Sequence, residues 1–250
     1  MARRLFTSSR HFRTKLPDLN ARHRQPELMD APSLAPAPRA SALRALARVN
    51  ALSGVTQRIW SEIHELSSVE VPRKIRILDV ACGGGDVVVS LARRAARAGL
   101  DVEAHGCDVS PAALEVARVN ADRVGVQAHF FEVDVLRGEM PDGYDIVCCS
   151  LFLHHLDESD AVALLGVMAQ SSCRTLLVQD LRRTVAGYLL AFGVLRMISR
   201  SEVAHTDGPR SVEGAFSLQE ARELAHRAGL EGARVDACWP QRFCLTWRRG

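Results

Sequence analysis

The sequence lacks the patterns that mark several common classes of protein. Its seven cysteines include no CxxC pair, and an odd number without that spacing fits neither a disulfide framework nor a zinc site. The longest apolar stretch, Val185 to Ile198, is interrupted by Arg196 and is shorter than the roughly 20 residues of a membrane-spanning helix. We therefore expect a reducing, cytoplasmic location and no integral membrane segment.

The chain also lacks a strong excess of either charge. Its formal net charge is +3 over 250 residues, which gives no reason to expect a nucleic-acid partner. The charge is unevenly distributed, because residues 1–48 carry ten Lys/Arg and three Asp/Glu, a balance of +7, and the remainder therefore carries −4. A basic arm on a mildly acidic body differs from a nucleic-acid-binding domain with one basic face.

What the sequence does contain is a regular alternation of strand and helix patterns. The expected strands are residues 75–80, 102–107, 127–133, 144–150, 175–180, 234–239 and 242–248, and the expected helices between them are residues 86–98, 111–124, 158–170 and 217–228. Such alternation predicts an α/β fold with a doubly wound, Rossmann-like, mostly parallel seven-stranded sheet and an antiparallel edge strand. Ligands of such sheets bind at the carboxyl ends of the strands.

The same patterns divide the chain into an arm and one domain. Residues 1–38 are polar, contain proline and show no periodicity, which predicts a basic arm or linker. Residues 39–250 form the expected domain. Its expected parts are N-terminal helices at 39–68, a cofactor-binding core at 70–180, a helical lid insert at 181–216, and a C-terminal helix with edge strands at 217–250.

Residues 78–86, LDVACGGGD, place glycines and carboxylates together at the end of the first strand. Gly83 and Gly85 allow a ligand to approach the backbone closely, because no Cβ atom intervenes. Asp79 can engage an ammonium group, either directly or through water. The rival reading is a dinucleotide site, but its GxGxxG pattern needs a third glycine where Val88 stands, and the flanking acids would repel a pyrophosphate.

Acids at the next strand ends complete the expected ligand. Asp108 ends the second strand, where it can accept hydrogen bonds from both ribose hydroxyls. Asp134, next to Val135, can accept from an adenine amino group, with Val109 packed against the ring. An adenosine that carries a cationic amino-acid arm and no phosphate fits these residues, and S-adenosylmethionine has that chemistry.

These residues resemble motif I and the later motifs of class I S-adenosylmethionine-dependent methyltransferases. The resemblance covers residues 70–180, and 217–248 by topology, with Ala81 in place of the first glycine of the family motif. The HHL sequence after the fourth strand and the lid-like insert are similar to the small-molecule methyltransferases of ubiquinone and menaquinone biosynthesis. The stretch RQPELMDAPSLAP resembles the N-terminal region of bacterial methyltransferases found beside polyketide genes. The cofactor-binding residues that we expect are Asp79, Ala81, Gly83, Gly85, Asp108, Val109, Asp134, Val135 and Ser150.

The stretch SLFLHH, after the fourth strand, contains the catalytic candidates His154 and His155. A phenol with a pKa of about 10 is mostly un-ionised at neutral pH, so a phenolic or enolic acceptor would need a base such as His154 or His155. We expect O-methylation rather than C-methylation. Adjacent residues of an extended segment cannot both face one site, so one histidine could orient the other. No acid follows these histidines closely except Asp157 and Glu158, and we predict no metal ion.

The apolar segment 181–216 is expected to cover a small, apolar, phenolic or polyketide-like acceptor. Arg182, Tyr188 and His205 are the expected acceptor contacts. The segment could instead pack on the sheet or on a second subunit, which leaves a homodimer open. Two other functions also remain open: a nucleic-acid or protein methyltransferase, although the Asn/Asp-Pro-Pro-aromatic motif is missing after the fourth strand, and a catalytically silent binding subunit.

Overall fold

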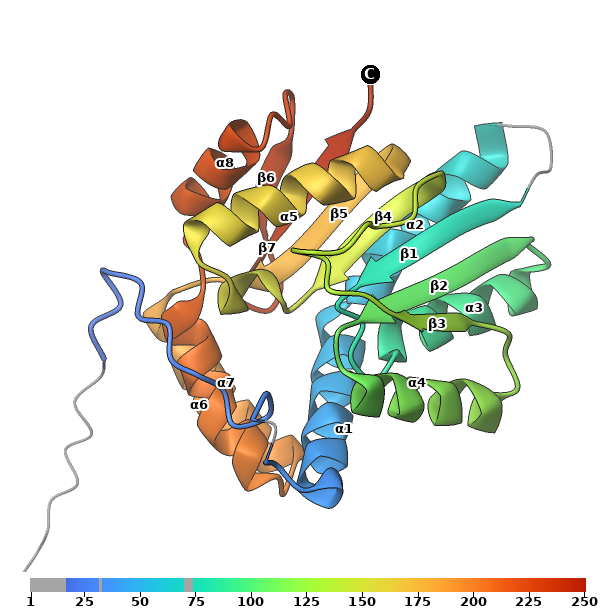
Figure 1. Cartoon of the computed structure of the whole chain (residues 1–250). Coiled ribbons are helices and arrows are strands. Elements are labelled where there is room, and N and C mark those ends of the chain that lie inside the picture. The colour runs from blue at the N-terminus through green and yellow to red at the C-terminus, as the bar shows by residue number, and fades with distance from the viewer. Residues whose placement is uncertain (1–16, 32, 70–73) are drawn as a thin grey trace, which may run out of the picture.

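The computed structural model describes residues 17–31, 33–69 and 74–250, so residues 1–16 and 32 of the expected basic arm lie outside the described residues. Strands and helices alternate along the chain as the sequence predicts (Figure 1). The strands are β1 Ile75–Val80, β2 Val102–Asp108, β3 His129–Glu132, β4 Tyr144–Ser150, β5 Ser172–Leu181, β6 Arg234–Cys238 and β7 Arg242–Arg248. The helices are α1 Pro36–Ser53, α2 Val55–Val69, α3 Asp86–Ala98, α4 Pro111–Val124, the 3-10 turn η1 Leu153–His155, α5 Glu158–Ser171, α6 Val185–Ile198, α7 Glu202–Gly214 and α8 Leu218–Arg227.

The seven strands form one sheet in the order β3-β2-β1-β4-β5-β7-β6. Strands β1 to β5 pair in parallel, and β7 runs antiparallel to both β5 and β6. The predicted α/β fold with an antiparallel strand near one edge is therefore confirmed. Because the parallel strands share one direction, their carboxyl ends bring residues from β1, β2, β4 and β5 to the same edge.

Helices cover both faces of the sheet (Figure 1). One face is buried by α5 and α8, whose Leu164 and Leu224 pack against β-strand residues such as Val147. The other face is buried by α2 and α3, with Ile63 and Leu91 in a second apolar cluster. Burial on both faces explains why the strands read as nearly continuous hydrophobic runs.

Local signals set where several helices begin. Ser110 caps α4, its hydroxyl accepting a hydrogen bond from the amide of Ala113, and Pro111 occupies the first turn. Ser217 and Glu220 form the predicted capping box at the start of α8. Helices α1 and α2 are separated by Gly54, which adopts a left-handed conformation.

Three helices lie together beyond the sheet edge where the parallel strands end. Helices α6 and α7 form an antiparallel pair next to α1 (Figure 1). The arm before α1 runs along α7, and the amide of His23 donates to the carbonyl of Glu213 at 3.0 Å. Helix α1 begins at Pro36, inside the segment expected to be a linker. Among the described residues, no helix is both long and apolar enough to cross a membrane.

Candidate active site

The glycine-rich loop after β1 lines a cavity of about 350 Å³. Ala81, Gly83 and Gly85 all have positive φ angles, so the loop turns sharply and leaves its backbone bare. The cavity also receives residues from the ends of β2 and β4 and from α1. Its volume is in the range of ordinary small-molecule sites.

Asp108 joins the glycine-rich loop to the end of β2. Its Oδ2 atom accepts a hydrogen bond from the amide of Gly83 at 2.8 Å, and its Oδ1 atom accepts from the amide of Ser110 at 2.9 Å. Burial raises the pKa of Asp108 against the opposing effect of these two amides. The carboxylate therefore has its position fixed on one side and is available to a ligand on the cavity side.

Two of the predicted cofactor-binding residues, Asp79 and Gly85, do not line the cavity. Asp79 is 2% exposed, accepts a weak hydrogen bond from the thiol of Cys148 at 3.6 Å, and does not line the cavity. Its pKa is raised well above the ordinary value by burial and by the nearby Asp86. Gly85 is also absent from the lining, and a Cβ atom there would lie 2.7 Å from that of Ala117. Gly85 therefore serves the packing of the loop.

Asp86 takes the position at the wall that the sequence assigns to Asp79. It lines the cavity at the start of α3, and one of its oxygens accepts from the side-chain amide of Asn50 at 3.1 Å. Burial raises the pKa of Asp86. Asn50 lies on α1, and the sequence contains no local pattern that connects it with the loop.

The other expected cofactor residues line the cavity as a group. They are Ala81, Gly83, Asp108, Val109, Asp134, Val135 and Ser150. The hydroxyl of Ser150 is buried and has no hydrogen-bond partner among the described residues. Besides the thiol of Cys82, the titratable lining holds four carboxylates, one guanidinium and one imidazole, namely Asp30, Asp86, Asp108, Asp134, Arg39 and His155. This set suits an adenosine with a cationic arm better than a pyrophosphate.

A second, mostly apolar cavity of about 320 Å³ adjoins the first. The two cavities share four lining residues, Met29, Leu46, Leu151 and His155. Helices α1, α6 and α7 and the turn before β7 supply most of the remaining wall, and Glu27, His154, Leu181 and Arg242 complete it. Apolar residues of α6 in this wall include Leu190, Ala191, Val194 and Leu195.

The expected acceptor contacts Arg182, Tyr188 and His205 line neither cavity. Tyr188 is half-buried on α6 and is not among the residues of that helix that line the second cavity. The Nε2 atom of His205 instead binds the carbonyl of Ser199 at 2.8 Å, in the turn between α6 and α7. Arg183, next to Arg182, pairs with Glu220 at 2.7 Å.

His154 and His155 lie in the turn η1, where a buried network holds His154. The Nδ1 atom of His154 is 2.7 Å from Oδ1 of Asp180 at the end of β5, and its backbone amide donates to the other oxygen at 3.1 Å. Burial opposes the charge of His154, but Asp180 and Glu27 outweigh it and raise the pKa to about 10. The pKa of Asp180 is lowered, since His154 outweighs the effect of burial.

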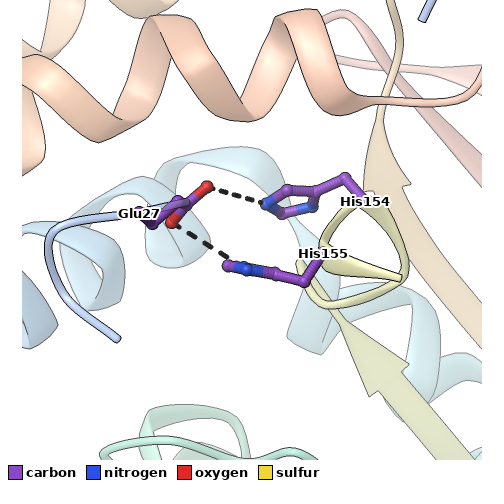
Figure 2. A group of neighbouring side chains, drawn as sticks. All are labelled: Glu27, His154 and His155. Carbon is purple, nitrogen blue, oxygen red and sulfur yellow. Dashed lines mark ion pairs between the residues drawn. The ribbon is translucent and has the colours of Figure 1, made fainter. Parts of the chain in front are cut away.

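Glu27, from the arm, faces both histidines from the opposite side of the cluster (Figure 2). Its carboxylate is 3.5 Å from Nε2 of His154 and 3.7 Å from Nε2 of His155. The Nδ1 atom of His155 lies 3.2 Å from a carboxylate oxygen of Asp30. We call Glu27, His154 and His155 the histidine cluster; their ligand-type atoms all lie within 4.8 Å of one another, so the cluster could hold a metal ion.

The arm that brings Glu27 to this place is anchored by hydrogen bonds. Asp207 of α7 accepts from the amides of Leu28 and Met29 at 2.8 and 3.0 Å. The guanidinium of Arg22 donates to the carbonyl of His154 at 2.8 Å, and that of Arg24 donates to the carbonyl of His155 at 2.6 Å. Sequence reasoning missed Glu27 and Asp30, whose only signal was the resemblance of the RQPELMD stretch.

The comparisons with known proteins agree with this geometry. Residues 77–172 match the family described as a methyltransferase domain. A ubiquinone biosynthesis O-methyltransferase of Xylella fastidiosa is 28% identical over 179 residues, which cover 69% of each chain. Among solved structures, magnesium protoporphyrin IX methyltransferase of Synechocystis PCC 6803 with bound SAH is 21% identical, with a TM-score of 0.54 over 79% of this chain and 84% of that one.

A SAM-dependent methyltransferase from Aquifex aeolicus has the same fold, with 16% identity and a TM-score of 0.58 over 86% of this chain and 99% of that one. The glycine-rich loop and the acids at the strand ends suit S-adenosylmethionine, the cofactor of such methyltransferases. The chain is a class I S-adenosylmethionine-dependent methyltransferase, distantly similar to ubiquinone biosynthesis O-methyltransferases.

Proposed function

We propose that this methyltransferase transfers a methyl group to a hydroxyl oxygen of a small, apolar, phenolic or polyketide-like acceptor. The observation that carries the proposal is the wall shared by the two cavities, in which His155 is the polar side chain among Met29, Leu46 and Leu151. A donor in the first cavity and an acceptor in the second would meet across this wall. The names of the curated relatives, which are O-methyltransferases, support an oxygen acceptor.

The first cavity would hold S-adenosylmethionine through its acids. Asp108 would accept from the ribose hydroxyls, Asp134 from the adenine amino group, and Asp86 would face the cationic amino-acid arm, with Asn50 beside it. Ser150 has a buried hydroxyl without a partner among the described residues, and it can donate to the ligand. When bound, the cofactor supplies an electrophilic methyl group on a sulfonium sulfur.

The second cavity favours an acceptor with little polar surface. Its wall on α6 and α7 is apolar, and Trp239 and Pro240 close one side. Its polar lining includes Ser211, Gln241 and Arg242, and the histidine cluster is the part of it that adjoins the first cavity, through His155. An aromatic acceptor would therefore bury its apolar body against α6 and direct its hydroxyl toward the histidine cluster.

The chemical step needs alignment and removal of one proton. Holding the acceptor oxygen in line with the methyl group can supply up to roughly 7–11 kcal/mol of the barrier reduction. The hydroxyl must also lose its proton, and we assign this task to His155, which lines both cavities. With a pKa of about 10, His154 already carries a proton at neutral pH, so of the two predicted catalytic candidates His154 has a positioning role, with Glu27 facing both rings.

The test is the rate of methyl transfer to a panel of phenols and quinols by wild type and His155→Ala. The variant should lose about 10²–10⁴-fold in rate, which is the usual effect of removing acid–base assistance. Its affinity for S-adenosylhomocysteine should stay within about threefold, because Asp108 and the glycine loop are untouched. His226→Ala, on the exposed side of α8, is the matched control. Equal rates for His155→Ala and wild type would refute the assignment.

A further inference from the structure

The histidine cluster has the spacing of groups that share an ion. The distances from Glu27 to His154 and His155, 3.5 and 3.7 Å, exceed the roughly 2.7–3.2 Å of hydrogen bonds. Two ligands at about 2.0–2.2 Å from one tetrahedral ion lie about 3.3–3.6 Å apart, close to what is observed. By contrast, His154 meets Asp180 at 2.7 Å, an ordinary hydrogen bond.

Each member of the cluster is also held by a partner on its far side. Asp180 binds Nδ1 of His154, and Asp30 lies at 3.2 Å from Nδ1 of His155, so Nε2 of both rings is directed to Glu27 (Figure 2). The hydroxyl of Ser211 donates to Oε1 of Glu27. Histidines that bind metal ions characteristically use one ring nitrogen while a carboxylate or carbonyl holds the other.

The site is open on one side. Glu27, His154 and His155 all line the second cavity and also a third cavity of about 280 Å³ beneath the arm. Three protein ligands with an open position are typical of catalytic rather than structural zinc sites. The open position would face the acceptor.

The cations near the cluster are arginines; Arg22 donates to the carbonyl of His154, and Arg242 lines the second cavity. Arg24 and Arg210 line the third cavity, but Arg24 donates to the carbonyl of His155 and Arg210 to the carbonyl of Pro26. The carboxylates of Glu27, Asp30 and Asp180 surround the two imidazoles. The local charge is therefore compatible with a divalent cation.

We propose that the histidine cluster is a divalent transition-metal site, with Nε2 of His154, Nε2 of His155 and the carboxylate of Glu27 as its three protein ligands. Two imidazoles and one carboxylate suit Zn²⁺, Mn²⁺ or Fe²⁺ better than Mg²⁺ or Ca²⁺. This revises the expectation of no metal, which considered only acids close to the histidines in the sequence. Folding supplies the missing acid from the arm.

The inference rests on the proposed function and names how the acceptor is activated. The acceptor hydroxyl would bind the ion at its open position, as water does in catalytic zinc sites, and release its proton to solvent. The resulting oxygen attacks the methyl carbon, the carbon–sulfur bond breaks, and its electron pair stays on the sulfur of S-adenosylhomocysteine. With the metal ion bound, His155 would be a ligand of the ion, and the ion would lower the pKa of the acceptor hydroxyl so that it loses its proton.

The test uses the full chain, stripped with a chelator and titrated with ZnCl₂ and MnCl₂ by calorimetry, with bound metal counted by elemental analysis. Wild type should bind about one ion per chain. Glu27→Ala and His155→Ala should each weaken binding by at least about 100-fold, since outer partners alone contribute about 10–100-fold. Asp180→Asn should weaken metal binding by about 10–100-fold, the effect of an outer partner, and His226→Ala should bind metal as wild type does. Visible absorption of the Co²⁺ form, lost in His154→Ala, gives a second readout.

Affinity for S-adenosylhomocysteine and the unfolding temperature establish that each variant is folded. Wild type that binds none of these ions, with or without an acceptor, overturns the metal site. If His155→Ala still slows methyl transfer in that case, the proposed function stands with the cluster acting as a base. If the ion binds but no acceptor is methylated, the proposed function fails instead.

Discussion

At the scale of single residues, Asp108 carries the most weight in the cofactor cavity. The substitution Asp108→Asn removes the negative charge of a carboxylate that accepts hydrogen bonds from the amides of Gly83 and Ser110. The same carboxylate would accept hydrogen bonds from the ribose hydroxyls. Hydrogen bonds to a charged group contribute about 1.5–3 kcal/mol, so affinity for S-adenosylhomocysteine should fall by about 10–100-fold in calorimetry. Asp122→Asn, on an exposed position of α4, is the control. Unchanged affinity in Asp108→Asn would contradict the role of this carboxylate.

The same carboxylate predicts a pH dependence. Burial raises the pKa of Asp108, so it takes up a proton at a higher pH than an exposed aspartate does. The bound cofactor favours the charged form, and affinity should therefore fall as the pH is lowered through the pKa of the free protein. Asp86, whose pKa is also raised, adds to this loss. Calorimetry from neutral to acidic pH should show a shallower fall in Asp108→Asn; a slope equal to that of wild type would exclude Asp108 as a source.

Several site residues could be predicted from the sequence because their position in the fold follows from local pattern. Asp108 and Asp134 follow recognisable strands, and parallel strands bring their ends together. Glu27 could not be predicted in this way, because its place depends on how the arm packs on α7. Asp79 shows a different limit, since strand alternation does not say whether the last side chain faces the cavity or the core.

At the scale of elements, the turn from β1 into α3 depends on glycine at one position in particular. In Gly85→Ala the new Cβ atom would lie 2.7 Å from that of Ala117 and 2.8 Å from the ring of Phe130, at a φ angle of +69°. Overpacking costs about 1–3 kcal/mol and the left-handed backbone about 1–2 kcal/mol, so the free energy of unfolding should fall clearly. Gly84→Ala meets only ordinary contacts near 3.6 Å and is the control. Equal urea midpoints for the two variants would contradict this packing.

Helix α6 gives a prediction about the acceptor. Ala191 lines the second cavity, whereas Leu189 on the same helix is 54% exposed. Ala191→Trp should fill the cavity and raise KM for the acceptor or abolish turnover, while affinity for S-adenosylhomocysteine remains unchanged. Leu189→Trp should leave both quantities as in wild type. Normal acceptor kinetics in Ala191→Trp would show that the acceptor binds elsewhere.

The elements themselves were largely predictable, because strand and helix periodicities differ and both faces of the sheet are buried. The orientation of α6 was not, because its sequence is apolar on most sides and gives no preferred face. The sequence therefore predicts Tyr188 as an acceptor contact, whereas Gly187 and Leu190 line the cavity. Helix α1 extends back to Pro36 because proline is tolerated in the first helical turn.

At the scale of the whole molecule, the site is assembled from three parts of the chain. The sheet supplies the cofactor cavity, α6 and α7 supply the apolar wall, and the arm supplies Glu27 to the histidines of η1 (Figures 1 and 2). The first part follows from a sequence pattern that many sheets share. The other two depend on contacts between distant segments, such as those of Asp207 with the arm.

The central claim is that a methyl group passes from the first cavity to an oxygen in the second. The most direct measurement is incubation of the full chain with isotope-labelled S-adenosylmethionine and a panel of phenols and quinols, followed by mass spectrometry and NMR of the product. We expect a labelled methyl ether, formed by wild type and lost in Ala191→Trp. A product methylated on carbon or nitrogen, or no product from any acceptor despite tight binding of S-adenosylhomocysteine, would contradict it.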